Sequence, residues 1–172
     1  MDDLELMRSV AAGDGRSIQG LIDEHYDSVY RFLRHLTRSR EDAEDLTQDV
    51  FLTARSKGSS FQGVGTVRSW LIRVAINAHA KHCRRERLRR ICHLTTHSKQ
   101  DSLDSFIDSE WLLSGIEKLP REQQIALLLF DVQGFSVREI ASATGCPEGT
   151  VKARLHHARK RLHQLLICPH EE

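Results

Sequence analysis

The chain has 172 residues, of which 40% are hydrophobic and 28% charged, so it can form one or two small globular domains. It shows no signal peptide, no apolar run of membrane-spanning length and no paired CxxC spacing among its four cysteines, which argues against a membrane-inserted or disulfide-stapled protein. We therefore expect a soluble protein of the reducing cytoplasm. The net charge is only +1, but it is segregated: residues 40–49 hold five acids and one Arg, whereas residues 68–93 hold eight Lys or Arg and one acid.

The first part of the chain predicts helices, because the three prolines, ten glycines and few alternating β-branched runs leave little material for a sheet. A short helix is expected over Leu4 to Val10, ended by the glycines at 13 and 15. A longer helix follows, for which Ser17 is a plausible N-cap. Its apolar stripe is made of Ile18, Leu21, Ile22, Val29, Phe32, Leu33 and Leu36.

A helix over residues 41–57 carries an acidic face. Its apolar side is predicted to be Ala43, Leu46, Val50, Phe51 and Ala54. Its outward side is Asp42, Glu44, Asp45, Gln48 and Asp49. Such a face is unlike a DNA-binding surface, so it is either solvated or meant for a basic protein partner. From these residues alone the solvated face is favoured, because acids near a helix N-terminus also stabilise the helix itself.

A glycine-bearing loop over residues 58–66 precedes a basic helix. The apolar stripe of this helix is Val67, Trp70, Leu71, Val74, Ala75 and Ala78, which favours a core position for Trp70 over a base-stacking one. The outward positions are Arg68, Arg73, Asn77, Lys81, Arg84 and Arg85, followed by Arg87, Arg89 and Arg90. A cationic helix in a chain of near-zero net charge suggests a contact with DNA.

The polar stretch after this helix, with Asp101, Asp104 and Asp108, lacks periodicity and is predicted to be a flexible linker. The expected division is a first domain over residues 1–92, a linker over 93–109 and a second domain over 110–172. The second domain opens with a helix from Trp111 to Leu119. Another helix follows from Arg121 to Val132, closed by Gly134.

Residues 136–163 predict a helix-turn-helix. Ser136 and Glu139 form a capping box, and Gly145 with Pro147 ends the first helix. The second helix buries Val151, Leu155, Ala158, Leu162 and Leu165. Its other faces give residues 148–163 a net charge of +4, as expected of a helix that lies against phosphates. A solvated basic helix of a bundle is the alternative. The fold expected from the whole sequence is all-α, with two small helical domains joined by a flexible linker.

An enzymatic or metal-binding role would have to rest on the histidines. His79, His82 and Cys83 share one stretch, and His163, Cys168 and His170 another. Neither group has a partner pair at the spacing of a metal site, and no nucleophile or phosphate loop accompanies them. We expect no catalysis, no metal and no cofactor; redox or metal sensing by the tail is the minor alternative to a frayed terminus.

Three segments carry a family likeness. The segment from Asp42 to Leu52 resembles the polymerase-binding segment of bacterial sigma factors, and residues 69–78 resemble their promoter-melting segment. Residues 135–155 resemble the reader of the minus-thirty-five element. The three occur in the family's order and the likeness spans about residues 4–166. With two domains and a short linker, the chain is similar to the extracytoplasmic-function (ECF) group.

The resemblance implies a transcription initiation factor with no chemistry of its own, acting as a monomer with core RNA polymerase and promoter DNA. It implies that Asp42, Glu44, Asp45, Gln48 and Asp49 dock on the β′ clamp helices, and the β flap is a second expected contact. An anti-sigma factor is an expected regulator. Minus-ten DNA contacts are implied for Phe61, Arg68, Trp70, Arg73, Asn77, Lys81, Arg84 and Arg85. The family often has an acid four residues after the Asn that matches Asn77, but this chain has Lys81 there. This departure affects the minus-ten sequence preference that the resemblance implies.

In the second domain, the resemblance and the usual docking of helix-turn-helix proteins place the start of the recognition helix in the major groove. The residues expected at base edges are Lys152, Ala153, His156 and His157. Those expected at phosphates are Arg138, Thr150, Arg154 and Arg159.

The rival hypothesis is a helix-turn-helix repressor or activator that binds DNA without polymerase, usually as a dimer. It accounts for the second domain, but not for an acidic helix beside a separate basic helix with a Trp.

Overall fold

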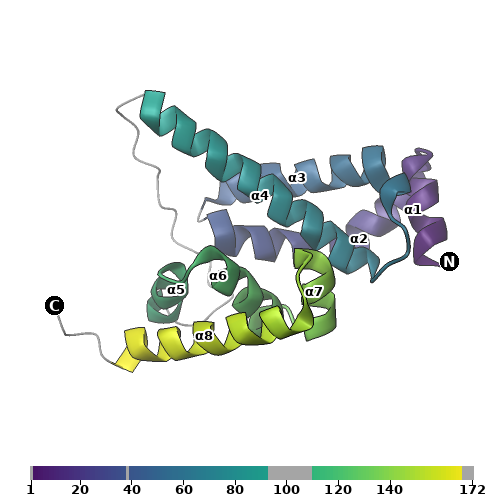
Figure 1. Ribbon diagram of the computed structural model, residues 1–172. Helices are drawn as coiled ribbons and strands as arrows, with labels where there is room; N and C mark the ends of the chain where they lie inside the picture. Colours follow the sequence, from purple (N-terminus) through teal and green to yellow (C-terminus); the bar gives the residue numbers. More distant parts are fainter. Residues whose placement is uncertain (1, 38, 93–109, 168–172) are drawn as a thin grey trace. The chain divides into compact units, whose positions relative to one another are not determined.

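The computed structural model describes residues 2–37, 39–92 and 110–167, so the predicted linker over 93–109 and the tail residues Cys168 and His170 lie outside the described residues. Within these ranges every regular element is a helix, which confirms the predicted all-α fold (Figure 1). The chain forms two compact units, which divide between Ser102 and Leu103.

In its described residues, the first unit is built from four α-helices and a short 3-10 helix. They are α1 (Asp3–Ala11), α2 (Gly15–Thr37), α3 (Arg40–Lys57), η1 (Gly58–Ser60) and α4 (Val67–Cys92). Helix α3 packs against both α2 and α4, and α1 packs against α2, α3 and η1 (Figure 1). The core consists of fully buried side chains that include Met7, Leu21, Val29, Phe32, Leu33, Val50, Leu71 and Ile72.

The first correction concerns the start of α2. The predicted N-cap was Ser17, but the helix begins at Gly15 and Asp14 is the capping residue, because Asp14 Oδ2 accepts the backbone N–H of Ser17 at 2.8 Å. Hydrogen bonds from the side chain and then the backbone of Ser17 lower the pKa of Asp14. Ser17 itself is buried in the first turn. Helix α3 is capped by Ser39, whose Oγ accepts the N–H of Asp42 at 3.2 Å.

The buried side of α4 is rotated from the predicted stripe. Val67, Leu71 and Ala75 are buried as predicted, and Ile72 is fully buried beside them. Three predicted stripe residues are only half-buried: Trp70, Val74 and Ala78. The reason is that α4 packs on α2 as well as α3, so two adjacent sides of the helix are covered and the predicted stripe lies at the edge of that surface.

The second unit consists of α5 (Glu110–Glu117), α6 (Arg121–Leu127), the π-helical segment η2 (Leu128–Val132), α7 (Val137–Thr144) and α8 (Glu148–Ile167). Helix α8 packs against α5, α6 and α7. Its contact with α5 is close at Gly115, where an added Cβ would lie 2.7 Å from Leu162 Cδ1.

The helix-turn-helix has the local structure that its sequence predicts. Glu139 N–H donates to Ser136 Oγ at 3.2 Å and Ser136 N–H donates to Glu139 Oε2 at 2.9 Å, which confirms the capping box. Gly145 closes α7 with a φ of 69°, in the left-handed region that glycine adopts without strain. The recognition helix then starts at Glu148, directly after Pro147.

The core of the first unit contains a neutral histidine near the end of α2. His35 is 6% exposed, and neither of its ring nitrogens has a hydrogen-bond partner among the described residues. Burial, and then the charge of Arg34, lower the pKa of His35 from 6.5 to about 4. The ring is therefore neutral in the folded chain at neutral pH.

This burial predicts a loss of stability in acid. Between pH 6.5 and pH 4 the unfolded chain binds a proton at His35 that the folded chain does not, so the free energy of unfolding falls as the pH falls through this window, by up to about 3 kcal/mol. Urea unfolding followed by Trp70 fluorescence in a Trp111→Phe background isolates the first unit. His35→Gln should flatten the pH dependence; an unchanged slope would contradict the assignment.

Candidate nucleic-acid interface

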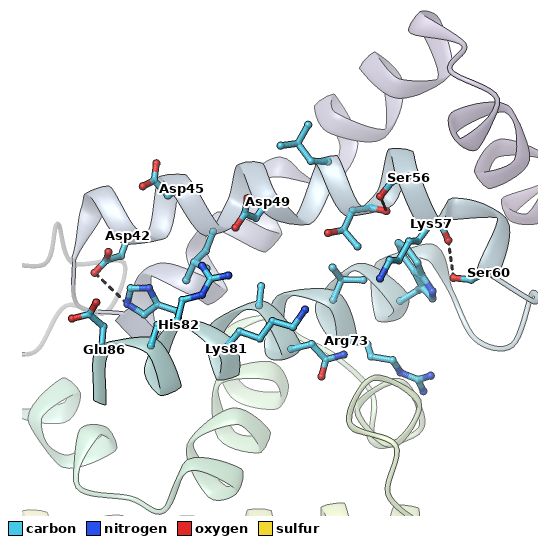
Figure 2. A pocket seen from close by; sticks show the side chains of 18 of the residues that line it. Asp42, Asp45, Asp49, Ser56, Lys57, Ser60, Arg73, Lys81, His82 and Glu86 are labelled. Carbon is cyan, nitrogen blue, oxygen red and sulfur yellow. Dashed lines mark hydrogen bonds and ion pairs between the residues drawn. The ribbon is translucent and has the colours of Figure 1, made fainter. Parts of the chain in front are cut away.

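A groove of about 800 Å³ lies between α3 and α4 (Figure 2). Its α3 wall carries the predicted polymerase-binding residues Asp42, Asp45 and Asp49. Its α4 wall carries five of the predicted minus-ten residues: Trp70, Arg73, Asn77, Lys81 and Arg85. The structure thus places on one groove two sets of residues that the sequence suggested only as separate helix faces.

The two walls touch at one end of the groove. His82 Nε2 lies 3.6 Å from Asp42 Oδ2, and both side chains are partly exposed. Figure 2 shows Glu86 of α4 beside this pair, and Glu86 in turn accepts a hydrogen bond from Arg89 Nη1 at 2.9 Å. The carboxylates of α3 and the Lys and Arg side chains of α4 thus line opposite walls of one groove, with Asp45 pointing away from α4 (Figure 2).

The floor of the groove is apolar where α4 begins. Trp70 and Val74 are half-buried there. The Trp70 ring meets Phe61 edge-on, with centroids 6.5 Å apart and an interplanar angle of 78°. Phe61 itself is 3% exposed, so in this conformation it supports Trp70 from behind and offers no surface to DNA. Its direct DNA contact stays a prediction that requires the loop to move.

Besides Phe61, two of the predicted minus-ten residues do not line this groove. Arg68 was expected on the outward side of its helix, but it is half-buried and its Nε donates to Ser28 Oγ of α2 at 3.4 Å. The outward placement of Arg68 was wrong because the first turn of α4 lies against α2, and its contact with minus-ten DNA stays a prediction. Arg84 is exposed and does not line the groove.

The acidic face of α3 is also divided. Glu44 pairs with Arg40 Nε at 2.8 Å, outside the groove lining. Burial, and then the charge of Glu44, raise the pKa of Tyr26, which stacks against Phe51 with ring centroids 6.3 Å apart. Gln48 is exposed between the two flanks. The five predicted polymerase contacts therefore form a broad surface on α3, whose two edges meet α2 and α4.

The exposed side of α8 carries the residues predicted for base edges. Val151, Leu155 and Ala158 are buried, which leaves Lys152, Ala153, His156 and His157 exposed. The rings of His156 and His157 meet edge-on with centroids 5.6 Å apart. Arg138 is exposed in the first turn of α7.

A second hollow, of about 690 Å³, lies along one flank of α8 and was not predicted. Its apolar lining comes from Phe130, Val137 and Leu155. Its cationic lining consists of Lys152, Arg159 and Lys160, with His156, His163 and Gln164 beside them. The periodic apolar stripe of α8 pointed to Leu155, but nothing in the sequence shows that Phe130 and Val137 come to lie next to it.

Two arginines predicted at phosphates already have partners inside the second unit. Arg159 Nη2 donates to Asp131 Oδ1 at 2.7 Å, and its Cζ lies 5.2 Å from the centre of the Phe130 ring. Arg154 Nη1 lies 3.5 Å from Cys146 Sγ. These contacts hold both side chains against the unit's own surface.

The histidine groups do not assemble into a metal site in the described part of the chain. Cys83 Sγ lies 3.4 Å from His79 Nε2, whereas His82 turns to Asp42. No group of three or more His, Cys, Asp or Glu side chains among residues 2–37, 39–92 and 110–167 could hold a metal ion. In the same ranges no helix combines the length and apolarity needed to cross a membrane.

Comparison with protein families finds two matches in order along the chain. The family "Sigma-70 region 2" matches residues 21–89, and "Sigma-70, region 4" matches residues 109–162. The first match contains the α3–α4 groove and the second contains the helix-turn-helix.

Similar curated proteins are ECF sigma factors. The ECF RNA polymerase sigma factor SigM of Mycobacterium tuberculosis strain H37Rv is 33% identical over 165 residues, covering 95% of this chain and 84% of SigM. SigC of M. tuberculosis strain CDC 1551 is 32% identical over 164 residues, covering 91% of this chain and 87% of SigC.

Two solved structures share the fold. The sigma factor RpoE, in complex with the anti-sigma factor NepR from Bartonella quintana, matches with a TM-score of 0.72 at 24% identity, covering 88% of this chain and 98% of that one. CnrH, in complex with the cytosolic domain of CnrY, matches with a TM-score of 0.72 at 23% identity, covering 97% and 98%.

The pairing of Arg159 with Asp131 predicts a difference between two arginines that are both expected at phosphates. Each phosphate contact contributes about 0.9 to the magnitude of the slope of log affinity against log salt concentration. Arg138→Ala should lower that magnitude for duplex DNA by about this much, because Arg138 is exposed. Arg159→Ala should lower it by less, because Asp131 already offsets its charge. Fluorescence anisotropy of the full chain across a salt series measures both; equal losses would contradict the expectation.

Proposed function

The chain belongs to the sigma-70 family of RNA polymerase sigma factors, in the ECF group, and from this premise we propose how its surfaces divide the work of initiation. It directs core RNA polymerase to promoters and acts where the polymerase is, in the cytoplasm, with no reaction of its own. The observation that carries the proposal is the α3–α4 groove, in which an acidic wall faces a cationic wall.

The acidic surface of α3 is proposed as the polymerase-docking surface. Its Asp45, Gln48 and Asp49 are exposed, and Leu52 beside them is 54% exposed. An exposed Leu next to acids such as Asp49 suits a basic, partly apolar protein surface better than DNA, whose phosphates the acids repel. We assign the β′ clamp helices of the polymerase to this surface.

The α4 wall is proposed to bind the melted minus-ten strand. Arg73, Lys81 and Arg85 supply charge for the phosphates, and the half-buried Trp70 supplies an apolar face for an unstacked base. The acids across the groove repel phosphates, so the backbone is expected along the outer side of α4, with bases turned inward. Asn77 stands on the same wall and can hydrogen-bond a base edge.

The exposed side of α8 is proposed to read the minus-thirty-five element as duplex DNA. Lys152, His156 and His157 lie on that side, away from the buried stripe of the helix. Arg138 and the partnered Arg154 and Arg159 are the proposed phosphate contacts at its edges. Capture of flipped bases by the first unit then stabilises the open promoter, while the second unit fixes the position of the start site.

Control by an anti-sigma factor is proposed as well. The sigma factor RpoE, which shares this fold, was solved with an anti-sigma factor bound. A protein that covers the acidic surface of α3 competes with the polymerase directly, because the two would need the same carboxylates.

The test is run-off transcription with core RNA polymerase on a library of promoter fragments. Wild-type chain should give new start sites, and Asp45→Lys with Asp49→Lys should abolish them, because reversed charges repel a basic partner. The matched control is Asp23→Lys with Asp27→Lys, which makes the same charge change on exposed residues of α2. These controls should keep the start sites.

Two results would contradict the proposal. Start sites that survive the α3 reversal would remove the docking surface from α3. Tight DNA binding without any start site, in the presence of a competent core enzyme, would instead favour a helix-turn-helix repressor.

A further inference from the structure

Helix α1 lies outside the part of the chain that matches the region 2 family, yet it contacts the loop between α3 and α4 along that loop's length. The family match begins at residue 21, whereas α1 spans Asp3–Ala11. The loop over residues 58–66 joins the two walls of the groove and contains Phe61, the support of Trp70.

The start of the loop is fixed by a close backbone approach. Gly58 is buried, and a Cβ added there would lie 2.8 Å from the carbonyl oxygen of Met7. That distance is shorter than any ordinary carbon–oxygen contact, so only a glycine lets α1 and η1 pack this closely. Met7 is 0% exposed in the same contact region. The middle of the loop is near α1 too, with Leu4 Cδ1 3.9 Å from a Cβ placed on Gly63.

The end of the loop is fixed by a carboxylate from α1. Asp3 Oδ2 accepts the backbone N–H of Val67, the first residue of α4, at 3.1 Å. Thr66 Oγ1 accepts the N–H of Ser69 at 3.1 Å in the same turn. Helix α4 has no acid in its own first turn, so the negative charge that a helix N-terminus favours comes from Asp3, 64 residues earlier.

We propose that α1 preorganises the loop over residues 58–66 for binding of the minus-ten strand, and that Asp3 is the residue of α1 that positions the end of this loop and the first turn of α4. The inference rests on the proposed function of the α4 wall. By capping α4, Asp3 holds the first turn of the helix in place. Trp70 belongs to this turn, because its backbone N–H donates to the carbonyl oxygen of Thr66 at 3.1 Å. Phe61 then stays behind the Trp70 ring, and the groove floor is formed before a DNA strand arrives. Binding therefore carries less of the entropic cost of ordering the loop.

The experiment measures two affinities of the holoenzyme assembled from the full chain and one affinity of the free chain. The holoenzyme is tested with a single-stranded oligonucleotide carrying the minus-ten element of a start site mapped by run-off transcription, and with a duplex carrying its minus-thirty-five element. The free chain is tested for its affinity to core polymerase. Asp3→Ala should weaken binding of the single strand about fivefold, which is the affinity change that corresponds to the stability contribution of one helix cap. Affinities for the duplex and for core polymerase should stay unchanged.

Three further variants separate positioning from general loss of stability. Asp3→Asn keeps an acceptor oxygen and should restore most of the single-strand affinity. Gly58→Ala forces α1 away from η1 and should reproduce the Asp3→Ala defect by an independent route. Asp14→Ala is the matched control, because it removes the cap of α2 without touching the loop, and it should leave single-strand binding as in wild type.

Single-strand affinity unchanged in Asp3→Ala, or lowered equally in Asp14→Ala, overturns the inference while the proposed function stands. A wild-type holoenzyme that does not prefer the minus-ten strand over a scrambled one overturns the proposed function, and this inference with it.

Discussion

The packing of α4 against both α2 and α3 is the constraint on which the first unit depends. One helix has to supply core residues such as Leu71 and Ala75 and, on its remaining surface, the cationic wall of the groove. Because α3 lies directly against it, the acids of α3 are held opposite the bases of α4. A groove with opposite charges on its two walls is a consequence of that contact, and the proposal of a protein partner for one wall and a nucleic acid for the other rests on it.

The two units support their proposed DNA-binding surfaces in different ways. In the second unit α8 is held by its buried residues and by the close contact of α5 at Gly115, so the surface proposed for duplex DNA is the exposed face of a firmly packed helix. In the first unit the proposed DNA surface is a half-buried Trp70 at the edge of the core, resting on the buried Phe61. A rigid helix suits a groove of regular duplex, whereas an apolar recess beside cations suits an unstacked base.

Local signals explain which predictions the structure confirms. The Ser136–Glu139 capping box and the glycine at position 145 are short-range features, and they end and begin helices whatever the remaining chain does. Where two neighbouring residues can both cap a helix, the sequence does not show which one does. Asp14 and Ser17 are both good capping residues, and α2 begins early enough for Asp14 to be its cap. Sequence periodicity also located Val151, Leu155 and Ala158, which are buried in α8, whereas Leu162 and Leu165 of the same predicted stripe are only half-buried.

The sequence by itself determined the all-α class, most helix limits and the segregation of charge between residues 40–49 and 68–93. It could do so because hydrophobic periodicity, caps and charge are read along one segment at a time. Only the tertiary structure decided that Arg68 turns to α2, that Phe61 lies behind Trp70 and that Asp3 caps α4. Each of these depends on a contact between segments distant in the chain, and a pattern within one helix carries no information about which neighbour will cover its sides.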